Sequence, residues 1–245
     1  MTAKSLRSMK ISDIVLDMVF PRHCPVCDGI IPFGGKLICR ECEEKTLFVK
    51  EPRCVKCGRM LDSDRKEYCR DCLQVSHAFD RAVSVFIYND ALQDAVFRFK
   101  YGGRQEYADF FAESIEKYLG REIRSFGAEA LIPVPIHRDR LAKRGFNQAE
   151  LIADRLGALM GIPAVKDLVV RTAATRPQKG LSREERRKNL KKAFKLTRND
   201  VKLTKVIIID DIYTTGSTVD ELSLLLRRAG ISEVYVVTVC SGSPV

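Results

Sequence analysis

The sequence predicts an α/β protein, with a doubly wound, mostly parallel sheet that follows a cysteine-rich double zinc ribbon. Two observations predict this architecture. Beyond residue 80, strand-like and helix-like apolar patterns alternate, which is typical of a parallel sheet covered by helices. Before it, cysteines recur in closely spaced pairs, which is typical of structural zinc sites. We therefore divide the 245 residues into an N-terminal amphipathic helix (1–22), a double zinc ribbon (23–76) and an α/β domain (77–245).

The N-terminal segment reads ISDIVLDMVF at residues 11–20, with apolar residues at helical spacing. Ser12 is a suitable cap, and Pro21 ends the pattern. Asp13 and Asp17 interrupt the run with charge, unlike the apolar core of a signal peptide or a membrane span. We expect a short helix on the body of a cytoplasmic protein that has no membrane span and keeps its cysteines reduced.

Eight of the nine cysteines form four CxxC pairs, and each pair begins 15 residues after the previous one. The segment HCPVCDGIIPFGGKLICREC aligns without a gap with RCVKCGRMLDSDRKEYCRDC, 30 residues later. Two CxxC pairs supply the four thiolates of a tetrahedral zinc site, and a unit this small needs the metal to fold. The array therefore predicts two structural zinc sites, with the ligands Cys24, Cys27, Cys39, Cys42, Cys54, Cys57, Cys69 and Cys72.

The cysteine spacing leaves the pairing open. We favour sequential sites, one in residues 24–42 and one in 54–72, because each repeat then supplies a complete ligand set. An interleaved arrangement satisfies the same ligand count. His23 and His77 flank the array, and we expect neither to bind metal because the cysteines already fill both sites. Cys240 lies in a late apolar run and is expected to be a buried small hydrophobe.

The α/β part can be divided into elements by its periodicity. Period-2 or continuous apolar runs predict strands, and helical spacing predicts helices, one of them bounded by Asn147 as cap and Gly161 as stop. In chain order we expect strand 81–89, helices 91–100 and 105–119, strand 129–135, helix 147–160, strands 166–171, 193–197 and 205–210, helix 217–230 and strand 233–240. Ligands of such sheets bind beyond the carboxyl ends of the strands, which makes the loops after Val134, Val170 and Ile209 candidates.

The run VIIIDDIYTTGST ends a buried strand with two acids and continues into a loop rich in hydroxyls. The start of the next helix offers free N–H groups, and Gly216 allows close approach of the backbone, which together suit a phosphate. Asp210 and Asp211 would repel a phosphate, but they accept hydrogen bonds from hydroxyls and can help to hold Mg²⁺. A phosphate with vicinal hydroxyls describes a ribose 5-phosphate.

This run resembles the motif of type I phosphoribosyltransferases that binds 5-phosphoribosyl 1-pyrophosphate (PRPP). The resemblance implies a type I phosphoribosyltransferase-like sheet and PRPP with Mg²⁺ as the ligand. It implies that Asp210 and Asp211 bind the ribose and act in catalysis. It also implies a PRPP-binding loop formed by Tyr213, Thr214, Thr215, Gly216, Ser217 and Thr218.

Three further segments resemble the ComF family, and the resemblance covers nearly the whole chain. They are FKYGGR at residues 99–104, IPVPIHRDRLAKRGFNQAELIA at 132–153 and RPQKGLSREERRKNLKKAF at 176–194. The resemblance implies a zinc ribbon joined to a phosphoribosyltransferase-like domain. It also implies a role in DNA uptake and natural transformation, with proteins of the competence machinery as possible partners.

A pyrophosphate group needs cations around it. The loop expected after Pro135 supplies Arg138, Arg140, Lys143 and Arg144, and Lys100 and Arg104 flank a Gly-Gly pair nearby in the sequence. We expect these six residues to bind the pyrophosphate or another anion. The basic segment 176–187 resembles the mobile loop that covers such sites, and a solvated linker is its alternative interpretation.

The chain has a net charge of +10, and residues 137–192 carry 15 Lys or Arg against 6 Asp or Glu. Such a surplus favours an anionic partner, either phosphates or nucleic acid. Tyr88 and Tyr101 are candidates for stacking on bases, whereas we expect the neighbouring Phe86, Phe97 and Phe99 to pack in the core.

Two functions are compatible with these patterns. The first is a PRPP-binding protein that also holds single-stranded DNA through basic loops during uptake. The second is an active, Mg²⁺-dependent phosphoribosyltransferase that releases pyrophosphate from PRPP. A PRPP-sensing transcription regulator has less support, because the sequence has no pattern typical of a helix-turn-helix with a recognition helix.

Overall fold

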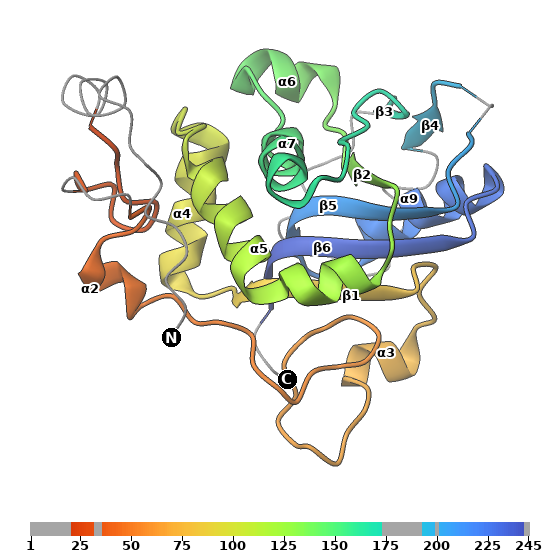
Figure 1. Cartoon of the computed structure of the whole chain (residues 1–245), viewed down its shortest axis with the longest axis horizontal. Helices are drawn as coiled ribbons and strands as arrows, with labels where there is room; N and C mark the ends of the chain where they lie inside the picture. The colour runs from red at the N-terminus through yellow and green to blue at the C-terminus, as the bar shows by residue number, and fades with distance from the viewer. Residues whose placement is uncertain (1–20, 32–35, 173–192, 199–200, 243–245) are drawn as a thin grey trace.

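The computed structural model describes residues 21–31, 36–172, 193–198 and 201–242 (Figure 1). Two predicted features fall outside these ranges. They are the basic lid at 176–187 and the amphipathic helix within 1–22, of which only the last two residues are described. Of the helices that are described, none is long and apolar enough to cross a membrane.

Four parallel strands form the central sheet in the order β1-β6-β5-β2. They are β1 (Arg81–Ile87), β2 (Ala130–Pro133), β5 (Lys205–Tyr213) and β6 (Glu233–Ser241). The central strand β5 pairs Ile209 with Pro133 of β2, and Asp210 with Thr238 of β6. Because all four strands run in one direction, their carboxyl ends meet at one edge of the sheet, as the sequence predicts.

Helices cover both faces of this sheet, which makes the fold doubly wound. Ile207 and Ile209 belong to the apolar cluster on one face, and Val206 and Ile208 belong to the cluster on the other. Alternate residues of β5 therefore serve different layers. Figure 1 shows α5 and α7 on one side of the strands and α9 on the other. The helices of the two layers are α4 (Asp90–Tyr101), α5 (Tyr107–Ser125), α7 (Gln148–Met160) and α9 (Ser217–Arg228).

Some helices and strands begin and end where the sequence predicted, and others are longer than predicted. The side chain of Asn147 caps α7 by accepting from the N–H of Ala149, and the left-handed Gly161 ends the helix. The strand β5 is longer than predicted, because its pairing with β6 continues as far as Tyr213 opposite Ser241. The acid pair is therefore part of a strand.

The strands predicted at 166–171 and 193–197 do not join the central sheet. They form a separate antiparallel pair of β3 (Val169–Arg171) with β4 (Phe194–Leu196). Both are short, and only one residue of each is buried, so they lack the continuous apolar run of the strands inside the central sheet. Val170 therefore does not end a strand of the central sheet, which corrects that part of the expectation.

Each zinc ribbon contains a short helix with a cysteine as its N-cap residue, α2 (Arg40–Glu43) or α3 (Arg70–Gln74). The first ribbon packs on the helical layer, where Arg98 of α4 donates to the carbonyl of Val26 at 2.6 Å. The second ribbon packs on the sheet, where the N–H of Ala82 in β1 donates to the carbonyl of Lys56 at 2.8 Å. The two ribbons therefore contact different parts of the α/β domain.

Candidate functional site

Each ribbon gathers its own four cysteines. The Sγ atoms of Cys24, Cys27, Cys39 and Cys42 lie within 4.8 Å of one another, and so do those of Cys54, Cys57, Cys69 and Cys72. The Sγ atoms of Cys27 and Cys39 are 3.8 Å apart, and those of Cys57 and Cys69 are 3.6 Å apart. Four thiolates around zinc at about 2.3 Å would lie about 3.8 Å apart, so both sites fit a tetrahedral zinc ion. The sequential pairing is confirmed.

His23, His77 and Cys240 belong to neither cysteine group. Instead, Nδ1 of His77 lies 2.7 Å from a carboxylate oxygen of Asp220 in α9. The thiol of Cys240 is fully buried in β6, in accord with its interpretation as a small hydrophobe.

Asp210 and Asp211 lie in the last part of β5, at the edge where the parallel strands end. Successive side chains of a strand point to opposite faces of the sheet, so the two carboxyl groups have different surroundings. Asp211 is buried, with 5% of its surface exposed, whereas Asp210 is half-buried. The two acids are therefore not equivalent, although they are neighbours in the sequence.

Asp211 forms an ion pair with Lys100, which lies near the end of α4. Burial disfavours the charged ammonium, but the Asp211 carboxylate outweighs this effect and raises the pKa of Lys100. Gln148 in the first turn of α7 donates to the same carboxylate through Nε2 at 3.5 Å. The structure thus pairs Lys100 with Asp211, and its predicted role in anion binding stays a prediction. Gln148, which was not among the predicted site residues, joins them.

Asp210 is surrounded by charges of both signs. Burial and the adjacent Asp211 raise the pKa of Asp210 to about 8, although Lys100 opposes the shift. Arg171 at the end of β3 faces this acid, and burial and Arg140 lower the pKa of Arg171 to about 10. At neutral pH Asp210 is therefore mostly protonated, so it can donate as well as accept a hydrogen bond. The sequence predicted neither Arg171 as a neighbour nor this protonation.

The loop between β5 and α9 is built from hydroxyls and a glycine. Gly216 has a φ of +77° and is the last residue before α9. The hydroxyls of Thr215 and Ser217 lie 2.8 Å apart, so they converge at the start of the helix. They lie at the N-terminal end of α9, whose positive end favours an anion, and the N–H of Ser217 donates to Oγ1 of Thr215 at 3.5 Å. The role of this loop in binding a phosphate stays a prediction.

Tyr213 was predicted in the same loop, but its side chain is only 4% exposed. Its hydroxyl lies 3.5 Å from Nε2 of His77, beneath the loop. Only the backbone of Tyr213 can therefore approach a ligand on the outer side. Sequence reasoning did not anticipate that His77 would lie beneath this loop.

The basic loop predicted after Pro135 is a helix, α6 (Arg138–Arg144). The ring nitrogen Nδ1 of His137 caps it by accepting from the N–H of Asp139 at 3.3 Å, and the left-handed Gly145 ends it. Sequence analysis missed this helix because its cap is a histidine and its length is only seven residues. Helical spacing gives the four cations fixed relative directions, which a loop would not.

The cations of α6 differ in their contacts. Arg144 forms a hydrogen bond with Oε1 of Gln148, and its guanidinium lies 4.9 Å from the ring centre of Tyr101. A continuous chain of contacts therefore runs from Asp211 through Gln148 and Arg144 to Tyr101. Arg138 is 92% exposed at its side chain, and Lys143 is also exposed.

Arg104 has a different position from the other predicted cations. Its Nη2 pairs with Asp28 of the first ribbon at 2.9 Å, and its Nη1 lies 3.3 Å from Nδ1 of His23. The nearby hydroxyl of Tyr107 donates to the same Asp28 at 2.5 Å. Arg104 thus contacts the zinc ribbon, and its predicted role in anion binding stays a prediction.

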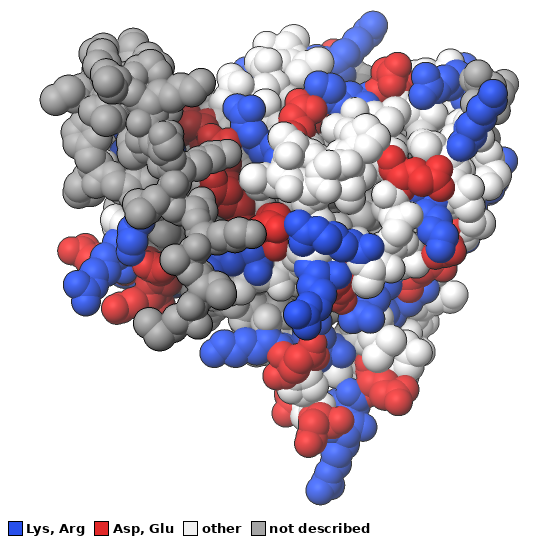
Figure 2. All heavy atoms as spheres, in the orientation of Figure 1, with Lys and Arg blue, Asp and Glu red and all other residues white. Residues whose placement is uncertain are grey.

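Only part of the positive surplus lies in the described residues. Seven of the 15 basic residues of 137–192 are described, namely Arg138, Arg140, Lys143, Arg144, Arg155, Lys166 and Arg171. Figure 2 shows positive and negative side chains interspersed on the visible face. The face in this view therefore shows no single positive region among the described residues.

Comparisons with known proteins match both parts of the chain. A family described as a double zinc ribbon domain matches residues 15–73, and a family described as a phosphoribosyl transferase domain matches residues 141–243. The second match includes the acid pair, the loop and α9.

Three curated proteins are similar over most of their length. Competence protein F of Haemophilus influenzae is 33% identical over 226 residues, which cover 89% of this chain and 96% of that protein. The DNA utilization protein YhgH of Escherichia coli K12 is 31% identical, with 91% and 98% covered. Competence protein ComFC of Streptococcus pneumoniae is 28% identical, with 80% and 84% covered.

Proposed function

Because this chain belongs to the ComF family, in which a double zinc ribbon precedes a phosphoribosyltransferase domain, we propose that it binds PRPP and single-stranded DNA and acts in DNA uptake. The names of its relatives, competence proteins and DNA utilization proteins, support the role in uptake. The predicted cytoplasmic location is compatible with this role.

One observation carries the PRPP part of the proposal. A buried acid held by Lys100 and a loop of converging hydroxyls lie at the same edge of the sheet, joined by the end of β5. The acids suit the ribose hydroxyls, and the loop suits the 5-phosphate. Asp211, and Asp210 once it has lost its proton, are also suitable for holding Mg²⁺, which would neutralise charge on the pyrophosphate.

Calorimetric titration of PRPP in the presence of Mg²⁺ tests this part. Changing both acids, Asp210→Asn with Asp211→Asn, should weaken binding by roughly tenfold or more, because the hydroxyls lose two carboxyl partners, of which Asp211 is the charged acceptor. Changing the exposed Asp64→Asn in the second ribbon serves as the control. If the wild-type chain does not bind PRPP or ribose 5-phosphate at millimolar concentration, this part of the proposal is wrong.

The DNA part rests on an exposed aromatic pair beside the site. Phe97 and Tyr101 of α4 are 62% and 65% exposed, and their ring centres are 5.1 Å apart. Phe97 was expected in the core, but it faces solvent one helical turn from Tyr101. Tyr88, the other predicted stacking residue, is partly buried against the core. Flat rings beside the Arg144 guanidinium suit unpaired bases and their phosphates.

Fluorescence anisotropy with a labelled oligodeoxythymidine tests the DNA part. Binding should weaken as salt increases, and Tyr101→Ala should weaken it about fivefold or more through lost stacking. Arg144→Ala should reduce the salt dependence of binding. Arg155→Ala should not, because Arg155 of α7 forms an ion pair with Asp109 of α5. Arg138→Ala and Arg140→Ala test whether the other arginines of α6 also contribute to DNA binding. An affinity for the oligodeoxythymidine that changes neither with salt nor with any of these substitutions would contradict the proposal.

The alternative function is an active phosphoribosyltransferase. Both acids, the hydroxyl loop and Lys100 lie together, which favours it. In this reaction the bond from the ribose to pyrophosphate breaks, a bond to an acceptor nitrogen forms, and the acceptor proton passes to solvent. Pyrophosphate release from PRPP and Mg²⁺ should then appear with at least one base of a panel. It should disappear in the double change of Asp210 and Asp211.

A further inference from the structure

The second zinc ribbon reaches the phosphate loop through a buried arginine. Arg59 follows Cys57 by two residues and is only 7% exposed. Its Nη2 donates to the backbone carbonyl of Thr214 in the loop at 2.9 Å, and its Nη1 pairs with Asp71 of the same ribbon at 3.0 Å. The guanidinium therefore joins the ribbon to the loop across 155 residues of sequence.

The zinc site holds the backbone of this arginine. The carbonyl of Arg59 accepts from the N–H of Cys54 at 2.8 Å, and the N–H of Gly58 donates to the carbonyl of Cys54 at 2.9 Å. Arg59 thus belongs to the turn that presents Cys54 and Cys57 to the metal. The direction of its side chain depends on that turn.

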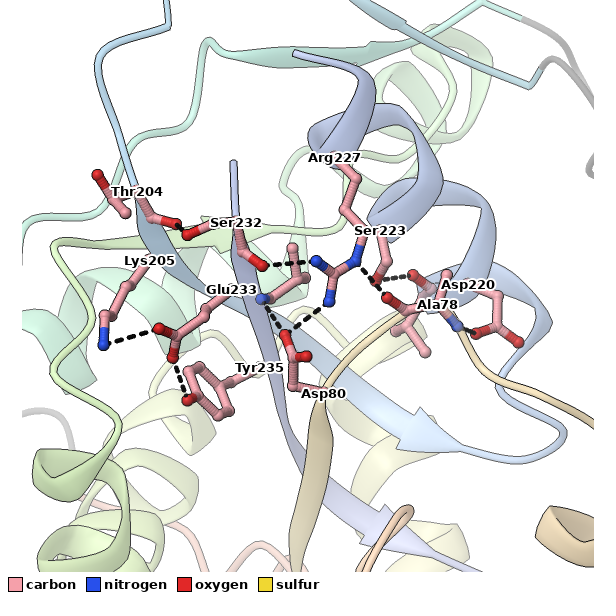
Figure 3. Close-up of polar contacts among 12 residues, drawn as sticks. Ala78, Asp80, Thr204, Lys205, Asp220, Ser223, Arg227, Ser232, Glu233 and Tyr235 are labelled. Atoms are coloured by element: carbon pink, nitrogen blue, oxygen red, sulfur yellow. Dashed lines mark hydrogen bonds and ion pairs between the residues drawn. The ribbon is translucent and has the colours of Figure 1, made fainter. Parts of the chain in front are cut away.

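The linker after the second ribbon, residues 77–80, is hydrogen-bonded to α9, the helix that follows the phosphate loop. The carboxylate of Asp220 accepts from the N–H of Ala78 at 2.9 Å and contacts Nδ1 of His77 at 2.7 Å. Two turns further along, Arg227 donates to the carbonyl of Ala78 and to the carboxylate of Asp80, both at 2.7 Å. Figure 3 shows the two α9 side chains reaching the same linker.

The linker also fills the space beneath the loop. A Cβ atom on Gly216 would lie 3.0 Å from Cε1 of His77 and 2.6 Å from the hydroxyl of Tyr213. Since the ring of His77 has no exposed surface, the loop rests directly on it. The underside of the phosphate loop is therefore built by the second ribbon and its linker.

We propose that Arg59 and His77 are positioning residues for this loop, so that zinc in the second ribbon and a phosphorylated ligand in the loop stabilise each other. The ligand half of this inference rests on the proposed PRPP binding. Zinc fixes the turn that carries Arg59, and Arg59 fixes the carbonyl of Thr214. Coupling between two sites is reciprocal, so the ligand must in turn strengthen the retention of zinc.

The first ribbon provides an internal control. In the repeat alignment the position of Arg59 is occupied by Gly29, so the first ribbon has no corresponding side chain. Its own polar link runs from Asp28 to Arg104 and Tyr107, at the start of α5. Loss of the first zinc should therefore leave the phosphate loop in place.

Hydrogen exchange of the loop, followed by mass spectrometry on the zinc-loaded full chain, tests the inference without a ligand. Arg59→Met should make the amides of 215–218 exchange roughly tenfold faster, with both zinc ions retained. Arg53→Met is the matched control, since this partly buried ribbon arginine pairs with Glu51 and Glu122 and not with the loop. Cys72→Ser should act as Arg59→Met does, and Cys42→Ser should not. Unchanged loop exchange in Arg59→Met would overturn the inference.

Zinc release to a chelator tests the coupling. Saturating ribose 5-phosphate should slow the release of one of the two zinc ions by about fivefold or more in the wild-type chain, and not in Arg59→Met. Faster loop exchange in Arg59→Met without any ligand binding would refute the proposed PRPP site alone and leave the positioning role intact. Ligand binding with normal affinity in Arg59→Met would refute the coupling alone.

Discussion

At the scale of residues, the acid pair shows how a strand separates two identical neighbours. Asp211 is buried with Lys100 and Gln148, and Asp210 lies half-buried near Arg171. The alternation of the strand causes this difference, because it directs adjacent side chains to opposite faces. The two carboxyl groups should therefore respond differently to mutation and to pH.

Lys100→Met should destabilise the fold by about 3 kcal/mol. The change leaves the Asp211 carboxylate buried without its counter-charge, whereas a methionine fills the space of the aliphatic stem. The double change Lys100→Met with Asp211→Asn should be less destabilising than the single change, because it removes both charges. Urea unfolding of the zinc-loaded proteins measures the unfolding free energies of the single and the double variant. A single change with no effect on the unfolding free energy would contradict the buried ion pair.

Asp210 should give the protein a pH-dependent stability. The pKa of its carboxyl is raised to about 8 in the fold, above its ordinary value of 3.8. Its contribution is therefore fully present below about pH 4 and is lost progressively as the pH rises towards 8. Asp210→Asn should accordingly gain stability relative to the wild type from pH 5 to pH 8, with a constant difference above pH 8. Denaturant titrations at pH 5, 7 and 9 measure this difference, and a gap independent of pH would refute it.

At the scale of elements, β5, the loop and α9 form one unit whose shape depends on a single glycine. Gly216 adopts a left-handed backbone conformation and lies against Tyr213 and His77. The conformation turns the chain so that the first helical N–H groups and the hydroxyls of Thr215 and Ser217 meet. A side chain at this position would be disfavoured by the left-handed backbone conformation and would also collide with Tyr213 and His77.

Gly216→Ala should destabilise the protein more than the matched change Gly161→Ala. Both glycines have similar positive φ values, +77° and +72°, so both changes should cost about 1–2 kcal/mol from the backbone. At Gly161 no atom lies within 4 Å of the added Cβ, whereas at Gly216 Tyr213 and His77 must move. Thermal unfolding of the two variants measures the difference. Equal losses of stability would show that the packing beneath the loop does not resist the methyl group.

At the scale of the whole molecule, the two ribbons contact the α/β domain at separate places. The first joins the helical layer through Asp28 and Arg104, and the second joins the loop between β5 and α9 through Arg59. Each ribbon keeps its four cysteines within one repeat, so the two zinc sites are chemically independent. The two repeats therefore have the same arrangement of metal ligands but contact the α/β domain through different residues.

The purified chain should contain two zinc ions, and Cys42→Ser should retain one. Sequential sites predict this result, because the change removes one ligand from the first site and leaves the second complete. Elemental analysis with native mass spectrometry measures the metal content. Loss of both ions from this single change would indicate ligands shared between the repeats.

The sequence by itself determined the parts of this protein that depend on local spacing. Four CxxC pairs at a 15-residue interval determined two metal sites, and apolar periodicity determined a parallel α/β domain with its acid pair at a carboxyl edge. The caps of α7 at Asn147 and Gly161 also followed from the residue types. In each case the relevant groups are close in the chain or repeat at a fixed period, so local geometry is sufficient.

Only the tertiary structure decided which distant residues complete the site. Gln148 and Arg171 reach the acids, and Arg59 and His77 support the loop, from positions more than 35 residues away in the chain. The folding of α6, the separation of β3 and β4 from the main sheet and the exposure of Phe97 were also not predicted. The physical reason is that these features depend on packing between elements, and a pattern along one segment carries no information about the surface against which it will pack.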